Sequence, residues 1–274
     1  PKEVKWVSVV LYAPLGERAG EYNLYMSVKP GGPTSEISLK AIIPQKGGIE
    51  IVAPANLAKE PGVVVELPFQ IHNTGNGDDT FTIQEIDISK TDWDVSVTID
   101  GKPAYRVPSP KVKPGATKIA LVRVTVPYEA DSTAEGKLGV RVALTAHSNF
   151  DKTKEDARGS YIKVLQFWRV IFNVDKVNVT TKPNERVEFT LVVKNDGNGL
   201  DNITLRMEYS MTDWSIGLTQ SWFNLSKGTG RTATLSISPS VRALKGEYWI
   251  TMSATSTGPP DAPAGFDRRG SDLP

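Results

Sequence analysis

The segment Asn73-Thr-Gly-Asn-Gly-Asp-Asp79 decides the fold, because the chain spells it a second time as Asn195-Asp-Gly-Asn-Gly-Leu-Asp201. Each copy ends one run of alternating apolar residues and precedes another, which predicts a reversal between two antiparallel strands. The pairs Asn76-Gly77 and Asn198-Gly199 are typical of a tight primed hairpin turn, since both residue types tolerate a positive φ. We therefore predict a structural role for these four residues.

The sequence around the two segments repeats as well. Thr91-Asp-Trp93 returns as Thr212-Asp-Trp214 at almost the same offset, and Gly136–Val142 matches both Gly20–Met26 and Gly246–Met252. Repeat units of roughly a hundred residues are whole sandwich domains, because solenoid units are much shorter. The chain is therefore expected to be an array of domains.

Apolar residues alternate with polar ones in the runs that flank the repeated segments. In the first run they fall on one parity, at Val63, Val65, Leu67, Phe69 and Ile71. This period of two is the pattern of a strand with one buried face, and no helical periodicity of any length occurs. The expected fold is all-β, with tandem Ig-like antiparallel β-sandwiches. Tyr161–Val174 contains no Gly or Pro, so we expect a stiff extended junction and a rod-like array.

We divide the chain into four parts. Residues 1–48 are expected to be the C-terminal strands of a preceding Ig-like domain, and residues 49–166 a complete sandwich. Residues 167–257 form a sandwich that lacks its last strand. The Pro/Gly-rich residues 258–274 are a tail or linker, since their composition does not suit a central strand. The open edge of the last sandwich would need a cover from further chain, this tail or a neighbour.

Composition excludes several classes of partner. The 32 Lys and Arg nearly balance the 31 Asp and Glu, and no stretch concentrates charge, so no nucleic-acid partner is expected. The sequence has no Cys, which excludes disulfides and thiol chemistry. No apolar run approaches the length of about 20 residues that a membrane-spanning helix needs.

The string Val-Lys-Asn195-Asp-Gly-Asn-Gly, the Thr-Asp-Trp214 motif and Gly246-Glu-Tyr248 together resemble a known extracellular module. The chain is similar to the tandem Ig-like or fibronectin-like repeats called NPCBM-associated or CARDB-type domains. Such repeats occur in archaeal and bacterial surface proteins, including S-layer-like proteins. The resemblance implies a cell-surface location and structural roles for the Asn/Gly turn and the Trp. It offers no catalytic residue to carry over.

Candidates for catalysis and metal binding are few. The two histidines, His72 and His147, both fall on the outward parity of their strands and are expected to be exposed. We therefore expect no enzyme, no catalytic residue, no bound metal and no cofactor. Four acidic residues near the repeated segments could instead gather around calcium, but their spacing favours turn chemistry; they are Asp78, Asp79, Asp196 and Asp201.

Several other residues are candidates for contacts or modification. Trp93 and Trp214 stand at equivalent strand starts and are expected in the cores. Trp249 opposes the apolar parity of its strand, and with Trp222 it is a candidate contact residue. Three Asn-X-Ser/Thr sequons occur only in the last repeat, so Asn178, Asn202 and Asn224 are predicted N-glycosylation sites of a domain that faces the exterior.

The function that these features favour is a non-catalytic structural segment of an extracellular surface-layer or surface-filament protein. It would act through contacts between domains and between protomers, so its expected partners are copies of itself in a lattice or filament. The alternative is an adhesin stalk or a carbohydrate-binding accessory module of a secreted enzyme, with glycans as partners of the exposed tryptophans.

Overall fold

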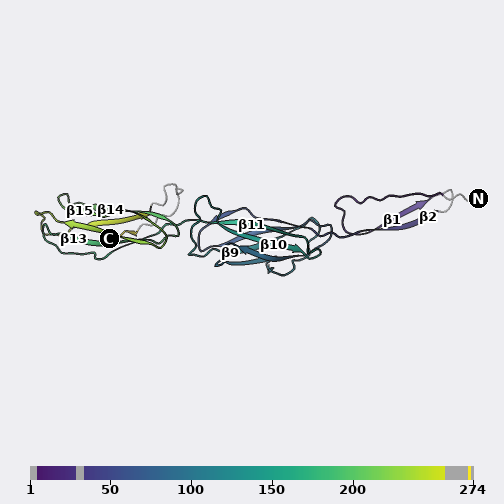
Figure 1. The fold of residues 1–274 in the computed structure, drawn as a ribbon, viewed down its shortest axis with the longest axis horizontal. Coiled ribbons are helices and arrows are strands. Elements are labelled where there is room, and N and C mark those ends of the chain that lie inside the picture. The colour runs from purple at the N-terminus through teal and green to yellow at the C-terminus, as the bar shows by residue number, and fades with distance from the viewer. Residues whose placement is uncertain (1–4, 29–33, 257–270, 273–274) are drawn as a thin grey trace, which may run out of the picture. The chain divides into compact units, whose positions relative to one another are not determined.

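The structure is a computed structural model that describes residues 5–28, 34–256 and 271–272. Its regular elements in these ranges are all strands (Figure 1). In chain order they are β1 (Gly20–Val28), β2 (Ser35–Ile43), β3 (Ile49–Val52), β4 (Leu57–Lys59), β5 (Val64–Asn73), β6 (Phe81–Ile88), β7 (Asp94–Ile99), β8 (Lys102–Pro103), β9 (Thr117–Thr125), β10 (Val140–Ser148), β11 (Glu155–Val164), β12 (Val170–Val174), β13 (Val187–Asn195), β14 (Asp201–Tyr209), β15 (Ser215–Leu218), β16 (Trp222–Leu225), β17 (Gly230–Ser238), β18 (Ile250–Ser256) and β19 (Ser271–Asp272).

The chain divides into two compact units, each described by itself below. Unit 1 comprises residues 1–57, 64–126 and 140–162, and unit 2 comprises residues 58–63, 127–139 and 163–274. The division into four parts expected from the sequence stays a prediction.

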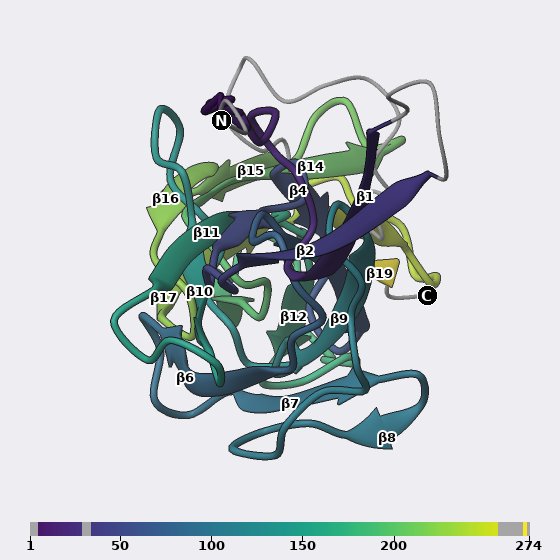
Figure 2. The same cartoon turned by 90° about the vertical axis from the view of Figure 1, so that its right-hand side faces the viewer.

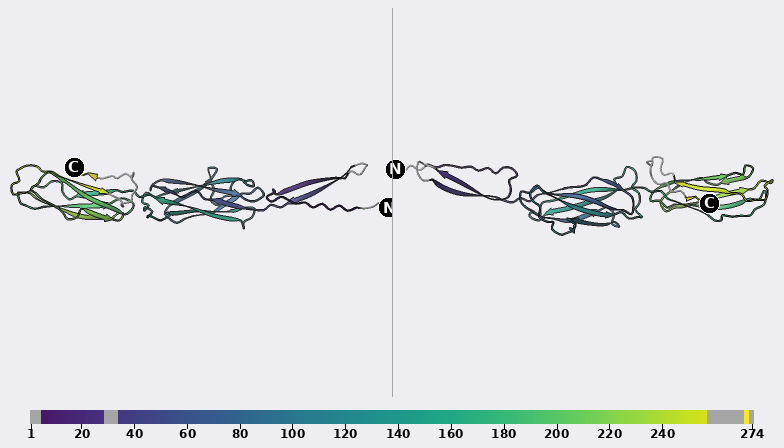
Figure 3. Two further views of the ribbon diagram at one scale, coloured as in Figure 1. Left: turned by 90° about the horizontal axis from the view of Figure 1, so that it is seen from above. Right: turned by 180° about the vertical axis from the view of Figure 1, so that it is seen from behind.

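Unit 1 contains the hairpin β1-β2 and most of two larger sheets. Their strand orders are β3-β5-β9-β7-β8 and β4-β11-β10-β6. Pairing is antiparallel in β5–β9, β7–β9 and β10–β6, and the short β7–β8 pair lies at the bottom of the view in Figure 2. Unit 2 repeats this arrangement with sheets ordered β12-β13-β17-β15 and β16-β14-β18-β19, which appear as two layers in Figure 3.

Alternation builds the core of each sandwich, as the sequence predicts. Along β5 the side chains of Val65, Leu67, Phe69 and Ile71 are buried while those between them are not. In unit 2 both sheets contribute to one apolar cluster that includes Leu191, Ile203 and Phe223. Full burial of such a side chain stabilises by roughly 1.5–3 kcal/mol. The all-β prediction with antiparallel sandwiches is confirmed; the rod-like array stays a prediction.

Two local expectations differ from the structure. Tyr161–Val174 is not one extended strand, because β11 ends at Val164 and β12 begins at Val170. The intervening residues bond to the repeated segment instead of to a strand, as described below. The last sandwich was expected to lack its closing strand and to need a cover on that edge, but Ser271 and Asp272 of the tail pair with β18 there as the two-residue strand β19. The remainder of the tail lies outside the described residues.

Candidate functional site: the two asparagine–glycine clamps

The repeated segments connect the two sheets of a sandwich. Asn73–Asp79 leads from β5 to β6 and Asn195–Asp201 from β13 to β14, and in both cases the two strands belong to different sheets. Among the described residues positive φ occurs at several other positions, but not at Asn76-Gly77 or Asn198-Gly199. The predicted primed hairpin turn is therefore wrong. A connection between two sheets does not need the twist of a two-residue hairpin. The asparagines and glycines of the segment instead make the contacts described next.

The first asparagine of each segment fixes the segment's own shape. The buried Asn73 side chain donates from Nδ2 to the carbonyl oxygens of Gly77 at 2.9 Å and Val112 at 2.8 Å. Its Oδ1 accepts the amide of Gly75 at 2.9 Å. All three polar positions of this buried amide are thereby satisfied, which burial requires.

The second asparagine reaches out of the segment to other parts of unit 1. Asn76 Oδ1 accepts the amide of Lys46 at 2.7 Å, and Nδ2 donates to the carbonyl oxygens of Pro44 at 3.1 Å and Glu17 at 3.3 Å. Its own carbonyl accepts the amide of Ala19 at 2.8 Å. One residue therefore holds both the chain that enters the sandwich and the loop before β1.

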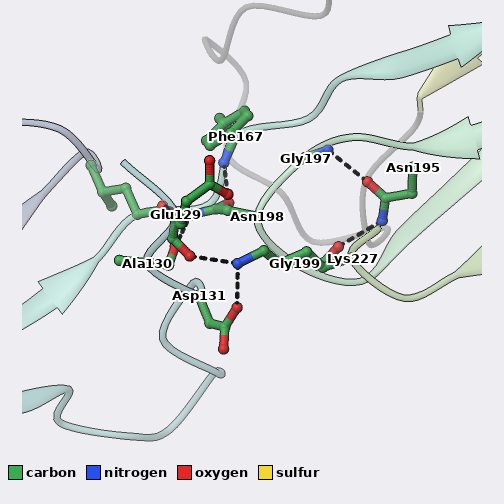
Figure 4. A network of polar contacts seen from close by, with 10 residues as sticks. Glu129, Ala130, Asp131, Phe167, Asn195, Gly197, Asn198, Gly199 and Lys227 are labelled. Atoms are coloured by element: carbon green, nitrogen blue, oxygen red, sulfur yellow. Dashed lines mark hydrogen bonds and ion pairs between the residues drawn. The ribbon is translucent and has the colours of Figure 1, made fainter. Parts of the chain in front are cut away.

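Unit 2 makes its own set of contacts in the same pattern (Figure 4). Asn198 Oδ1 accepts the amide of Phe167 at 2.8 Å, and Nδ2 donates to the carbonyl oxygens of Leu165 at 3.0 Å and Ala130 at 3.2 Å. The amide of Ser132 donates to the Asn198 carbonyl at 2.9 Å. Asn195 shapes this segment as Asn73 shapes the first, through Gly199, Leu225 and Gly197.

We call these two sets of contacts the first and second clamps. The first clamp is Asn73–Asp79 with Pro44–Lys46 and Glu17–Ala19. The second clamp is Asn195–Asp201 with Leu165–Phe167 and Ala130–Ser132. Both bury the amide of an asparagine that binds backbone groups only.

The glycines let backbone come close to the clamped chain. A Cβ at Gly75 would lie 2.5 Å from the carbonyl oxygen of Lys46, and one at Gly197 would lie 2.6 Å from that of Phe167. A Cβ at Gly77 would meet the side chain of Gln45, and one at Gly199 that of Gln166. Glycine is required here because a side chain has no space, and not because of its freedom in φ.

Gly199→Val is expected to destabilise unit 2 by about 1–3 kcal/mol, because the new side chain overlaps Gln166 and Ser132. Unit 1 should be little affected. Denaturant-dependent hydrogen exchange, read by mass spectrometry on peptides from each unit, measures the two stabilities separately. Unchanged exchange in unit 2 would show that Gly199 does not face the clamped chain.

Two ion pairs lie at the second clamp. Lys227 Nζ lies 2.7 Å from Asp131 Oδ1 and donates to the carbonyl of Glu129 (Figure 4). Arg169 pairs with Asp196, whose position corresponds to Thr74 in the first clamp. The hydrogen bond from Arg169 lowers the pKa of the Asp196 carboxyl below its ordinary value of 3.8.

This pair predicts an acid dependence that is confined to unit 2. Because the folded pKa of Asp196 is depressed, its contribution is complete above pH of about 4 and is lost as pH falls through the folded pKa. Asp196→Asn should lower the stability of unit 2 by about 0.5 kcal/mol at pH 7, since Arg169 is half exposed, and this deficit should shrink progressively as pH falls below about 4. Unit-resolved exchange over this acid range measures the deficit. A deficit that does not shrink as pH falls would contradict the assignment.

The acidic residues near the segments also have structural partners. Buried Asp79 accepts the amides of Thr80 and Phe150, and buried Asp201 accepts the hydroxyl of Ser256 at 2.8 Å. In the described ranges no three His, Cys, Asp or Glu side chains gather as metal ligands would. The calcium alternative therefore gains no support from these residues.

The two histidines do not share an environment. His72 is half-buried and its Nδ1 lies 2.5 Å from the hydroxyl of Thr117. His147 is buried, so the expectation that both are exposed is wrong for this residue. Its strand β10 is central in its sheet, between β6 and β11, and buried residues occur on both of its faces, with Ala143 and His147 on the outward parity. Parity alone identifies the outward face only where one face of the sheet meets water.

The candidate tryptophans and the sequon asparagines differ in their surroundings. Trp249 and Trp222 are 69% and 53% exposed, which suits contact residues, whereas Trp214 packs partly buried on the core and its ring centroid lies 4.6 Å from that of Tyr248. Trp93 in unit 1 is buried. The sequon asparagines occupy three settings: Asn178 is exposed outside any strand, Asn202 lies in β14 and Asn224 in β16.

Sequence reasoning missed the clamped chain. No strong motif marks the two segments that the asparagines bind, Pro44–Lys46 and Leu165–Phe167. Their backbone amides and carbonyls make the hydrogen bonds to Asn76 and Asn198. One signal was available: Gln45 and Gln166 precede the two clamped amides by one residue. Gln45 donates to the carbonyl of Asp78 at 3.0 Å, and Gln166 to that of Leu200 at 2.6 Å.

Comparisons with known proteins give no family. No family model matches the chain, and no curated protein matches it. Among solved structures, the D00–D0 domain of intimin is 11% identical with a TM-score of 0.33, covering 82% of this chain and 98% of its own. The titin domains Z1Z2 in complex with telethonin are 14% identical with a TM-score of 0.26, covering 83% and 94%. The secreted serine protease VesC from Vibrio cholerae is 9% identical with a TM-score of 0.30, covering 75% of this chain and 49% of that protease.

The described ranges also contain no helix with the length and apolar character needed to span a membrane. The fold class of the chain thus rests on its own strands and sheets: it is a protein of tandem Ig-like β-sandwiches.

Proposed function

We propose that the chain is a non-catalytic structural segment of an extracellular surface-layer or surface-filament protein. The observation that carries this proposal is the duplicated clamp. In both copies the side chain of the second asparagine, half-buried Asn76 or buried Asn198, binds only backbone groups of its own unit, so it fixes one segment of that unit against another. A protein that bears load or holds its neighbours at a fixed distance needs chain segments that are fixed in this way, whereas domains joined by flexible linkers do not.

The hairpin β1-β2 supports contacts between domains. Its register runs from Gly20 opposite Ile43 to Val28 opposite Ser35, and it is the only two-stranded sheet in the described ranges. Ile37, Leu39 and Ile42 are exposed on it. A hairpin with apolar side chains in water is marginal by itself, so we propose that residues 1–48 are the last strands of a preceding sandwich whose other strands cover them.

Electron microscopy of the native protein at the cell surface tests the proposal. Ordered sheets or filaments with a regular repeat are expected, and immunogold label against this chain should lie on them. Label confined to the cell interior, or only dispersed monomers at the surface, would contradict it.

A second candidate is an adhesin stalk or an accessory module that binds carbohydrate. The exposure of Trp249 favours it, because an aromatic face in water is a platform for a sugar ring. A glycan array probed with the whole chain and with Trp249→Ala decides between the candidates. Binding that the substitution abolishes would favour the module, and no binding would favour the structural segment.

A further inference from the structure

The sequons at Asn202 and Asn224 lie opposite each other on neighbouring strands. Asn202 of β14 and Asn224 of β16 are partners in the antiparallel ladder, and Asn224 Nδ2 donates to Asn202 Oδ1 at 2.7 Å. Directly opposed residues have Cβ atoms about 5 Å apart. Two N-linked glycans attached to these asparagines would therefore overlap near their first sugars, so there is space for only one glycan on the pair.

The two asparagines differ in what surrounds them. In the sheet order β16-β14-β18-β19, Asn224 stands on the edge strand and Asn202 on a strand with neighbours on both sides. The hydroxyl residue of the Asn224 sequon, Ser226, is exposed beyond the end of β16. That of the Asn202 sequon, Thr204, is half-buried inside β14, opposite Trp222. A transferase must take the acceptor as extended chain, and a short edge strand opens at lower cost than a central one.

Trp222 provides a surface for a sugar on Asn224. Alternation places both side chains on the outer face of β16, while Phe223 and Leu225 point into the core. The Cα atoms of Trp222 and Asn224 are separated by about 6.7 Å along the strand, so the indole is within reach of the first sugar ring on Asn224. The apolar face of a pyranose packs on an indole by dispersion and by removal of apolar surface from water.

We propose that Asn224 is the glycosylated member of this pair, that its first sugar packs on Trp222, and that Asn202 stays unmodified in the folded chain. Exposed Asn178, which lies outside any strand, accepts a glycan independently. The biological use of these sites rests on the proposed location outside the cell, but the choice between Asn202 and Asn224 depends only on unit 2.

The reaction is transfer from a lipid-linked sugar donor. The lone pair of Asn224 Nδ2 bonds to C1 of the sugar, the bond between C1 and the phosphate oxygen breaks, and the lipid-linked phosphate leaves with that electron pair. One amide proton passes to the transferase. The second N–H of Asn224 remains available for its hydrogen bond to Asn202.

The test treats the whole folded chain with a purified oligosaccharyltransferase that accepts Asn-X-Ser/Thr and with its lipid-linked donor, followed by peptide mapping. Modification at Asn224 and Asn178, with Asn202 at least tenfold lower, is expected. The same chain treated in its urea-unfolded state should accept at Asn202 as well. Modification of Asn202 in the folded chain, or none at Asn224, would overturn the proposal.

A thermal measurement tests the platform separately. Enzymatic removal of the glycan should lower the Tm of unit 2 by about 4 °C in the wild type and in Trp222→Tyr, which keeps an aromatic face, but not in Trp222→Ala. Trp222 is half exposed, so its loss leaves the core intact. An equal drop in Trp222→Ala would overturn the platform. If the proposed location at the cell surface is wrong, only the microscopy will show it. If the proposed glycosylation at Asn224 is wrong, only the transferase and thermal assays will show it.

Discussion

Asn198→Ala is expected to lower the free energy of unfolding of unit 2 by about 3 kcal/mol. The substitution removes three side-chain hydrogen bonds and leaves the amide of Phe167 and the carbonyls of Leu165 and Ala130 without their partner. Asn198 is 2% exposed, so water cannot replace the lost amide at no cost. An unsatisfied buried group costs about 1–3 kcal/mol. Unit-resolved hydrogen exchange in denaturant measures the effect.

Asn76→Ala is the matched control. It removes the corresponding bonds to Lys46, Pro44 and Glu17, so it should destabilise unit 1 and leave unit 2 unchanged. Each variant should therefore lower the stability of its own unit and leave that of the other unit unchanged. If either variant loosened both units equally, or neither unit, the clamps would not be the local devices described here.

Gly197→Ala is expected to cost about 3 kcal/mol in unit 2, more than Gly199→Ala. Its Cβ would lie 2.6 Å from the carbonyl oxygen of Phe167, which is backbone and can move only if the clamp opens. At Gly199 the nearest atoms belong to the side chains of Gln166 and Ser132, which can rotate away. The order of these two costs separates steric exclusion by the clamped backbone from crowding of side chains.

Gly217→Ala is the control for adding a methyl group to unit 2. Gly217 lies in β15 and a Cβ there would meet nothing within 4 Å. Its effect should stay below about 0.5 kcal/mol. A cost at Gly217 equal to that at Gly197 would mean that the loss reflects glycine replacement in general.

The strands were predictable because burial of one face imposes a period of two. β5 and β13 follow their parity from end to end, and the repeat carries this register from one sandwich to the next. Parity failed at His147, where the strand is covered on both faces. Parity also does not show whether two consecutive strands belong to the same sheet. For this reason a hairpin was predicted at Asn76-Gly77, where the structure has a connection between two sheets.

The clamps could be predicted only in part. The duplicated asparagines and glycines were visible as a pattern, and their structural role was expected. Their partners are backbone amides and carbonyls of Pro44–Lys46 and Leu165–Phe167, which every residue type possesses and no composition reveals. The opposition of Asn202 and Asn224 was hidden for another reason, because it depends on the register between β14 and β16.

The most direct test of the clamps is the hydrogen exchange of two amides, those of Lys46 and Phe167, in the intact chain by NMR. Both lie outside strands and donate to a side-chain oxygen, of Asn76 and Asn198 respectively. If the clamps hold, these amides exchange as slowly as those in β5 and β13, and each becomes fast when its own asparagine is replaced by alanine. Exchange at the rate of an exposed loop in the wild-type chain would contradict the account.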